Sequence, residues 1–177
     1  MPDVSRDVRI KMLAERSSYV ENVLCHALVA GLSSLLWQRD PERSLQVFNS
    51  EVDNAGFDVI LACDNQLRYV QLKQAHAEKT PSHVSVRAPF ALLPGACVVL
   101  MSHGLNDLSL ANFRFYGGAS PIEPMPDIAS FAVSKSPGRR APDGTRKVRE
   151  NYRNVRVSQF HGPLNWPQLF EALFPAV

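Results

Sequence analysis

The spacing of apolar residues predicts a long helical segment at the start of the chain. Residues 7–38 carry apolar side chains at helical intervals and contain no proline. This pattern predicts one helix, or two helices broken near residues 17–18. Pro41 follows directly and ends the segment, because the residue before a proline is pushed out of the helical conformation.

Three short runs after this helix have the character of β-strands. They cover residues 45–48, 57–63 and about 67–74, and turn-forming residues separate each from the next. The first half of the chain therefore reads as a helix followed by three strands.

The second half contains one run that is typical of a buried strand, residues 96–102. The connection before it, residues 75–95, is long enough for the crossover that a parallel strand requires, with a short helix near residues 90–93. A parallel strand beside the earlier hairpins would make the sheet mixed.

Weaker signals predict strands at residues 112–116 and 128–133, and a C-terminal helix at about residues 167–174. With 177 residues and 45% hydrophobic content, the chain can bury one full core. We therefore expect a single α/β domain over residues 1–177, with a core at about 10–102 and a C-terminal extension at about 103–177.

Composition narrows the class of protein. The longest apolar stretch, residues 27–37, is interrupted by Gly and Ser and is too short to span a membrane, and the N-terminus lacks an apolar signal core. We expect a cytoplasmic protein without a membrane partner. Cys25, Cys63 and Cys97 lie in apolar stretches without metal-ligand spacing, so reduced core cysteines are expected and a zinc site is not.

The third strand carries the candidate chemistry. Side chains alternate along a strand, so Gln71 and Lys73 must point to the same face. A lysine in such a strand needs an acidic partner, and Asp58 opens the neighbouring strand. A loop of two residues (65–66) or four (64–67) would place Asp58 directly across from Lys73, whereas a loop of three would turn it to the other face.

These residues resemble a known family. A helix, three strands, a helix and a strand, with an acid at the start of the second strand and a Gln-x-Lys motif on the third, look like the PD-(D/E)XK nuclease superfamily, and the motif is similar to that of the Mrr-type restriction endonucleases. The resemblance covers roughly residues 10–102 and implies a restriction-endonuclease-like αβββαβ core with a mixed central sheet. The chain departs from the commonest pattern at Gln71, where a second carboxylate is usual.

The resemblance implies roles for five residues. Asp58 would ligate Mg²⁺ or Mn²⁺, and the Gln71 side-chain oxygen or the Leu72 carbonyl would add a hard oxygen ligand. Lys73 would orient or help to deprotonate the attacking water. Glu21 is the candidate for the helix carboxylate beside the metal, because its spacing to the leucines of the same helix turns it inward.

Other interpretations of the same residues stay open. Asp58 and Lys73 can form a structural ion pair across a hairpin, and Glu21 can be a carboxylate at the edge of the helix. Glu51 and Asp53, in the turn before Asp58, are either additional metal ligands or solvated turn residues.

Basic residues concentrate near the C-terminus. Residues 135–156 contain eight Lys or Arg against two acids, a local charge of +6, so the remainder of the chain carries −4. Such a segment is either a solvated loop or a phosphate-binding surface. The candidates for nucleic-acid contact are Lys135, Arg139, Arg140, Arg146, Lys147 and Arg149.

These features together predict a metal-dependent nuclease that acts on DNA in restriction, repair or mobile-element defence. The alternative is a nuclease fold that has lost hydrolysis and serves as a nucleic-acid or protein binding module. A third interpretation is a structural or regulatory protein without nucleic-acid contact. The sequence has no separate recognition domain, so specificity would come from loops or from a homodimer.

Overall fold

The long N-terminal segment forms two helices, α1 (Arg6–Glu15) and α2 (Ser17–Arg39). The computed structural model describes residues 4–49, 56–136 and 143–175. The break falls at Arg16, whose backbone N–H donates to the Met12 carbonyl and closes α1. The prediction of two helices broken near residues 17–18 is therefore confirmed.

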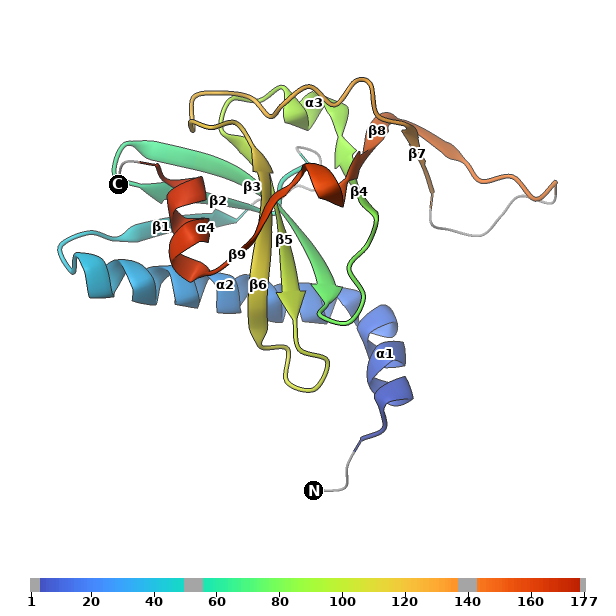
Figure 1. Cartoon of the computed structure of the whole chain (residues 1–177), viewed down its shortest axis with the longest axis horizontal. Helices are drawn as coiled ribbons and strands as arrows, with labels where there is room; N and C mark the ends of the chain where they lie inside the picture. Colours follow the sequence, from blue (N-terminus) through green and yellow to red (C-terminus); the bar gives the residue numbers. More distant parts are fainter. Residues whose placement is uncertain (1–3, 50–55, 137–142, 176–177) are drawn as a thin grey trace.

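Helix α2 packs along one face of the larger sheet (Figure 1). Its buried residues recur every four positions, so they form one apolar stripe, and each buried leucine contributes about 1.5–3 kcal/mol. The stripe comprises Val20, Leu24, Leu28, Leu32 and Leu36. By length and composition alone α2 could cross a membrane, a test that core helices of soluble proteins also pass. Here the stripe packs on the sheet.

The larger sheet has six strands in the order β1-β2-β3-β5-β6-β9. They are β1 (Leu45–Asn49), β2 (Val59–Cys63), β3 (Gln66–His76), β5 (Ala96–His103), β6 (Leu110–Gly117) and β9 (His161–Leu164). Strands β3 and β5 are parallel and the other neighbours are antiparallel. The predicted α/β class with a mixed central sheet is confirmed.

A second, three-stranded sheet differs from expectation. Its order is β4-β8-β7, formed by β4 (His83–Arg87), β8 (Val148–Arg156) and β7 (Val133–Lys135). The crossover from β3 to β5 thus contains a strand as well as the short helix α3 (Ala88–Ala91). The prediction of a strand at residues 128–133 is wrong except at its last residue, because residues 128–132 contain a turn and β7 begins at Val133. Val84, Val86 and Val155 bury one face of this sheet in a second core.

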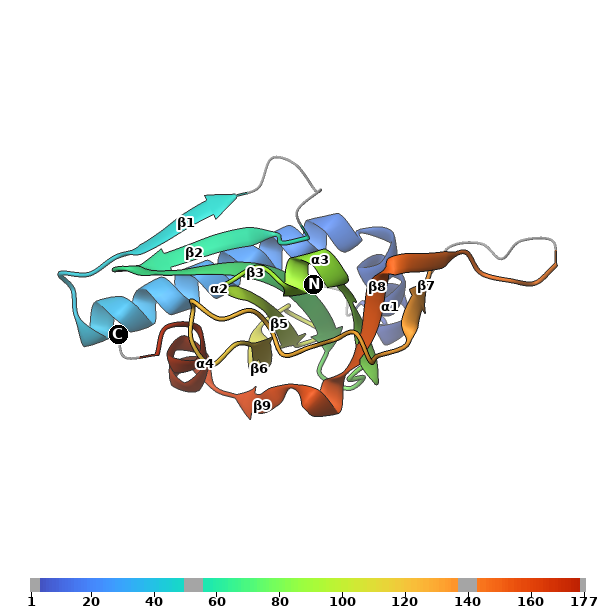
Figure 2. The ribbon, with the colours of Figure 1, turned by 90° about the horizontal axis from the view of Figure 1, so that it is seen from above.

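Strands β7 and β8 form an arm that projects away from the larger sheet (Figures 1 and 2). We call residues 133–136 and 143–153 the basic arm, because they carry most of the basic segment found in the sequence.

The C-terminal helix α4 (Trp166–Leu173) closes the end of the larger sheet. Asn165 and Gln168 cap its N-terminus reciprocally, and the expected helix at about residues 167–174 is confirmed. Trp166 lies against α2 where Gly31 has no side chain, since a Cβ there would come within 2.3 Å of the indole. The glycine therefore permits this close packing.

Arg68 on β3 holds α4 in place through hydrogen bonds to backbone carbonyls. It is fully buried, and its guanidinium donates to the carbonyls of Leu173 at 2.8 Å and of Ala172, Gly118 and Ser120 at 3.2 Å. Burial lowers the pKa of this guanidinium, and two of its partners, the carbonyls of Ala172 and Leu173, lie at the negative end of the α4 dipole. One cation thus ties the last turn of α4 and the turn after β6 to the central strand.

We expect Arg68→Met to destabilise the fold by at least about 3 kcal/mol, because several buried carbonyls lose their donor at about 1–3 kcal/mol each. Arg39→Met is the matched control, since Arg39 contacts Glu171 of α4 at the surface, where an ion pair contributes less than about 1 kcal/mol. Urea unfolding measures both. Equal effects of the two substitutions would contradict the anchoring role of Arg68.

Candidate active site

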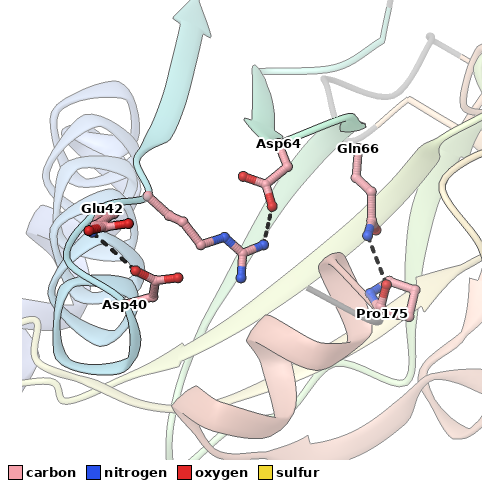
Figure 3. Close-up of polar contacts among 6 residues, drawn as sticks. Asp40, Glu42, Asp64, Gln66 and Pro175 are labelled. Carbon is pink, nitrogen blue, oxygen red and sulfur yellow. Dashed lines mark hydrogen bonds and ion pairs between the residues drawn. The ribbon is translucent and has the colours of Figure 1, made fainter.

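The turn between β2 and β3 sets the register of the candidate site. Its loop is Asp64 and Asn65, because Cys63 pairs with Gln66, and Asp64 adopts a positive φ of 51°. Asp64 also pairs with the guanidinium of Arg43, and Gln66 donates to the Pro175 carbonyl at 2.8 Å (Figure 3). The loop has an even residue count, as the predicted site required, but its centre lies one residue earlier than the centre of either expected loop.

This register corrects the expected pairing of Asp58 with Lys73. Strand β2 begins with Val59 opposite Val70, and the N–H of Asp58 also donates to the Val70 carbonyl at 2.9 Å. Asp58 therefore lies one residue before the paired ladder, next to the Val70 carbonyl of β3. The Asp58 carboxylate accepts the N–H of Leu72 at 2.6 Å. Asp58 therefore contacts the β3 backbone at Leu72 and does not lie directly across from Lys73.

Strand β3 continues beyond its partner β2. Pairing with β2 stops at Val70, while pairing with β5 continues to His76. The exposed edge of β3 and the first half of α2 enclose a cavity of about 720 Å³. The cavity includes Glu21, Asp58, Leu72 and Lys73 in its lining. Four of the five predicted site residues are thus brought together, from three separate elements.

Gln71 lies outside that lining. It pairs with Val98 of β5, is only 7% exposed, and its side-chain oxygen has no hydrogen-bond partner among the described residues. Val98 belongs to the second core, on the sheet face away from α2. The structure therefore does not bring the predicted Gln71 ligand oxygen to Asp58. Lys73 leaves β3 on the same side as Gln71, yet it still lines the cavity at the exposed edge.

Glu21 stands at the rim of the cavity. Val20 takes the buried position in the helical stripe, so Glu21, one residue later, is exposed to solvent. The expectation that Glu21 faces inward toward the core is therefore corrected, although its carboxylate is on the lining.

The donor set of the cavity suits a hard divalent cation. Two carboxylates, Glu21 and Asp58, and the amides of Asn49 and Gln74 all offer oxygen, the ligand that Mg²⁺ and Mn²⁺ prefer. Within residues 4–49, 56–136 and 143–175, no cluster of three or more His, Cys, Asp or Glu has metal-site spacing. Glu51 and Asp53 lie outside the described residues.

Cys25 also lines the cavity, and its protonation state limits the chemistry there. Burial, and then the nearby charge of Asp58, raise the pKa of this thiol. A protonated thiol is a poor nucleophile, which disfavours covalent catalysis by Cys25. Cys25, Cys63 and Cys97 are free, as expected from the sequence.

The predicted nucleic-acid-binding residues are distributed along the basic arm. Lys135, Arg146 and Lys147 are exposed, whereas Arg149 stacks on the Tyr152 ring at 3.5 Å from its centroid. Arg139 and Arg140 lie outside the described residues. The Asp143 carboxylate accepts hydrogen bonds from the Thr145 N–H and hydroxyl, so it stabilises the turn of the arm.

The buried position of Gln71 predicts that Gln71→Glu destabilises the fold and does not strengthen metal binding. The substitution buries a carboxylate without a partner, so we expect the fold to lose about 3–5 kcal/mol, with no recovery when Mg²⁺ is added. Gln71→Leu removes the unpartnered oxygen and should stay within about 1 kcal/mol of the parent. Thermal melting with and without Mg²⁺ tests this, and stabilisation of Gln71→Glu by Mg²⁺ would place the side chain at the metal.

Comparisons of the chain with protein-family models, curated proteins and solved structures found no match. The expected family, cytoplasmic location and homodimer therefore stay predictions. The features of the structure that bear on function are the cavity between α2 and β3 and the basic arm.

Proposed function

We propose that this protein is a divalent-metal-dependent nuclease that hydrolyses phosphodiester bonds of DNA in a restriction, repair or defence context. The observation that carries the proposal is the convergence of Glu21, Asp58 and Lys73 on one cavity, at the place where β2 and β3 separate. Two carboxylates beside one ammonium group suit a site that must hold a cation and an anionic phosphate together.

Each residue has a role in this proposal. Asp58 and Glu21 hold Mg²⁺ or Mn²⁺, and the bond from the Leu72 N–H fixes one oxygen of Asp58. When bound, the cation polarises a phosphoryl oxygen and lowers the pKa of a bound water. Lys73 binds the phosphate or orients that water, because its ammonium is a flexible point charge.

The arrangement of elements supports the same proposal. If β4 is left out, the elements follow one another in the order that the resemblance to PD-(D/E)XK nucleases implies. This order is α2, β1, β2, β3, α3 and β5. We propose a restriction-endonuclease-like core on this basis. Fold alone does not define activity, and the residues of the cavity are what support hydrolysis.

The second candidate function is a nucleic-acid binding module that has lost hydrolysis. The observation that favours it is the composition of β3, residues 66–76, which contains no Asp or Glu. With Gln71 buried, the cavity lacks the carboxylate that related sites take from this strand. Metal affinity would then be low, while the basic arm would still bind phosphates.

We expect Asp58→Asn and Lys73→Ala each to remove metal-dependent cleavage with little change in melting temperature. Asn at position 58 keeps an oxygen for the Leu72 N–H and loses only the charge, so the fold should persist. Cleavage of plasmid, linear and branched DNA with Mg²⁺ or Mn²⁺ measures the effect.

Lys11→Ala is the matched control, since Lys11 is an exposed lysine outside the cavity lining. Full activity in a clean Lys73→Ala preparation would refute the assignment of Lys73. Metal-independent DNA binding without cleavage by the parent protein would instead support the binding module.

The basic arm generates a separate prediction. Replacing Arg146 and Lys147 with Ala should weaken binding to duplex DNA and reduce the slope of log K against log salt by about 0.9 per lost phosphate contact. Fluorescence anisotropy at several salt concentrations measures the slope. An unchanged slope would show that the arm is a solvated hairpin.

A further inference from the structure

The proposed catalytic cavity is the first of three hollows that follow one another. Gln74 lines both this cavity and a second hollow of about 350 Å³ beneath α1. Pro81 lines both the second hollow and a third of about 570 Å³, between the start of β4 and the end of β8. Each hollow therefore shares a lining residue with the next. The series begins beside β3 and extends beyond the carboxyl end of that strand.

The chemistry changes along this series. The first hollow carries the carboxylates Glu21 and Asp58. Among the residues that the structure describes, none that lines the second or third hollow is acidic. Those two hollows present His76, Lys79, His103, His83 and Arg156. The nitrogen donors of the second and third hollows suit the binding of a polyanion. The carboxylates of the first hollow suit the place where a bond of that polyanion is cleaved.

The third hollow is lined by hydrogen-bond donors from two strands. His83 of β4 and Arg156 of β8 are register partners, so their side chains leave the sheet on the same face. The Ser82 hydroxyl lies 3.0 Å from His83 Nδ1, which orients the ring and leaves Nε2 to meet a ligand. Arg156 is exposed and forms no ion pair with a described residue. These are the groups that bind a phosphate.

The second hollow lies at the ends of the two parallel strands. His76 of β3 and His103 of β5 are register partners there, and Nδ1 of His76 is buried without a hydrogen-bond partner among the described residues. A buried polar atom without a partner is costly, and a ligand that bonds to it would remove that cost. Lys79 adds a positive charge at the same hollow.

We propose that the three hollows form one binding track for a single nucleic-acid strand, with a phosphate bound at His83 and Arg156 while the bond to be cut lies beside Asp58. This inference rests on the proposed nuclease function, whose substrate class it specifies. A single strand fits because a positively charged groove can follow its backbone, whereas a duplex is too wide to enter a series of small hollows. The recognised chemistry is the phosphodiester backbone, which both DNA and RNA supply.

The experiment measures binding of the full chain to a labelled single-stranded DNA, its duplex form and the same sequence as RNA, by fluorescence anisotropy in EDTA. Lys79→Ala and Arg156→Ala should each weaken single-strand binding several-fold and reduce the salt slope by about 0.7 per lost contact, while duplex binding stays unchanged. Arg39→Ala, which removes the same charge at the far end of α2, should bind like the parent. Melting curves confirm that each variant is folded.

The outcomes separate this inference from the proposed function. If Lys79→Ala and Arg156→Ala bind single strands as tightly as the parent while the parent cleaves DNA, the track is refuted and hydrolysis stands. If both variants lose single-strand binding while the parent cleaves nothing, the track stands and hydrolysis is refuted. Equal weakening of duplex and single-strand binding by both variants also overturns the track. Tighter binding of either DNA or RNA identifies the source of the strand.

Discussion

The unequal lengths of β2 and β3 are the constraint on which the candidate site depends. Strand β3 has 11 residues and β2 has five, so the pairing stops at Val70, and among the described residues the far half of β3 has a neighbouring strand on one side only. A strand edge must satisfy its backbone donors by other means. Asp58 does so for Leu72, and this bond holds a carboxylate at the mouth of the cavity.

Packing on both faces of the sheet keeps this edge in place. On one face the stripe of α2 buries the sheet, and on the other β4, β8 and α3 form the second core. Arg68 joins the half of β3 that pairs with β2 to α4 through carbonyl bonds, so this half of the strand is fixed. One half of β3 thus contributes contacts that stabilise the fold, and the other half carries residues of the candidate site. This division is common where a rigid scaffold positions a site.

The sequence predicted the elements whose apolar residues repeat regularly. The α2 stripe and the strands β2, β3 and β5 follow from such repeats, whereas the parallel crossover follows from the length of the connection at residues 75–95. Strand β8 could not be found this way, because its residues are mostly polar and only Val155 is buried. Its strand character comes from pairing with β4 and β7, which are distant in sequence.

The residues of the candidate site were predictable in kind, but their geometry was not. Alternation indicated that Gln71 and Lys73 share a face, whereas the contacts of Asp58 with the β3 backbone and the loop of Asp64 and Asn65 depend on local backbone conformation. The register and the bond from the Leu72 N–H place the Asp58 carboxylate at the β3 backbone and not directly across from Lys73. The series of hollows joins Gln74, Pro81 and Arg156, which no sequence motif connects.

The most direct test of the central claim is Mn²⁺ titration of the isotopically labelled protein, followed by paramagnetic broadening of its amide signals. If the cavity holds a divalent cation through Asp58 and Glu21, broadening should begin at Glu21, Asp58 and Leu72 and should disappear in Asp58→Asn. Signals of β9, at the opposite edge of the sheet, should stay sharp at the same Mn²⁺ concentration. Broadening that is centred elsewhere, or that persists unchanged in Asp58→Asn, would contradict a metal site in this cavity.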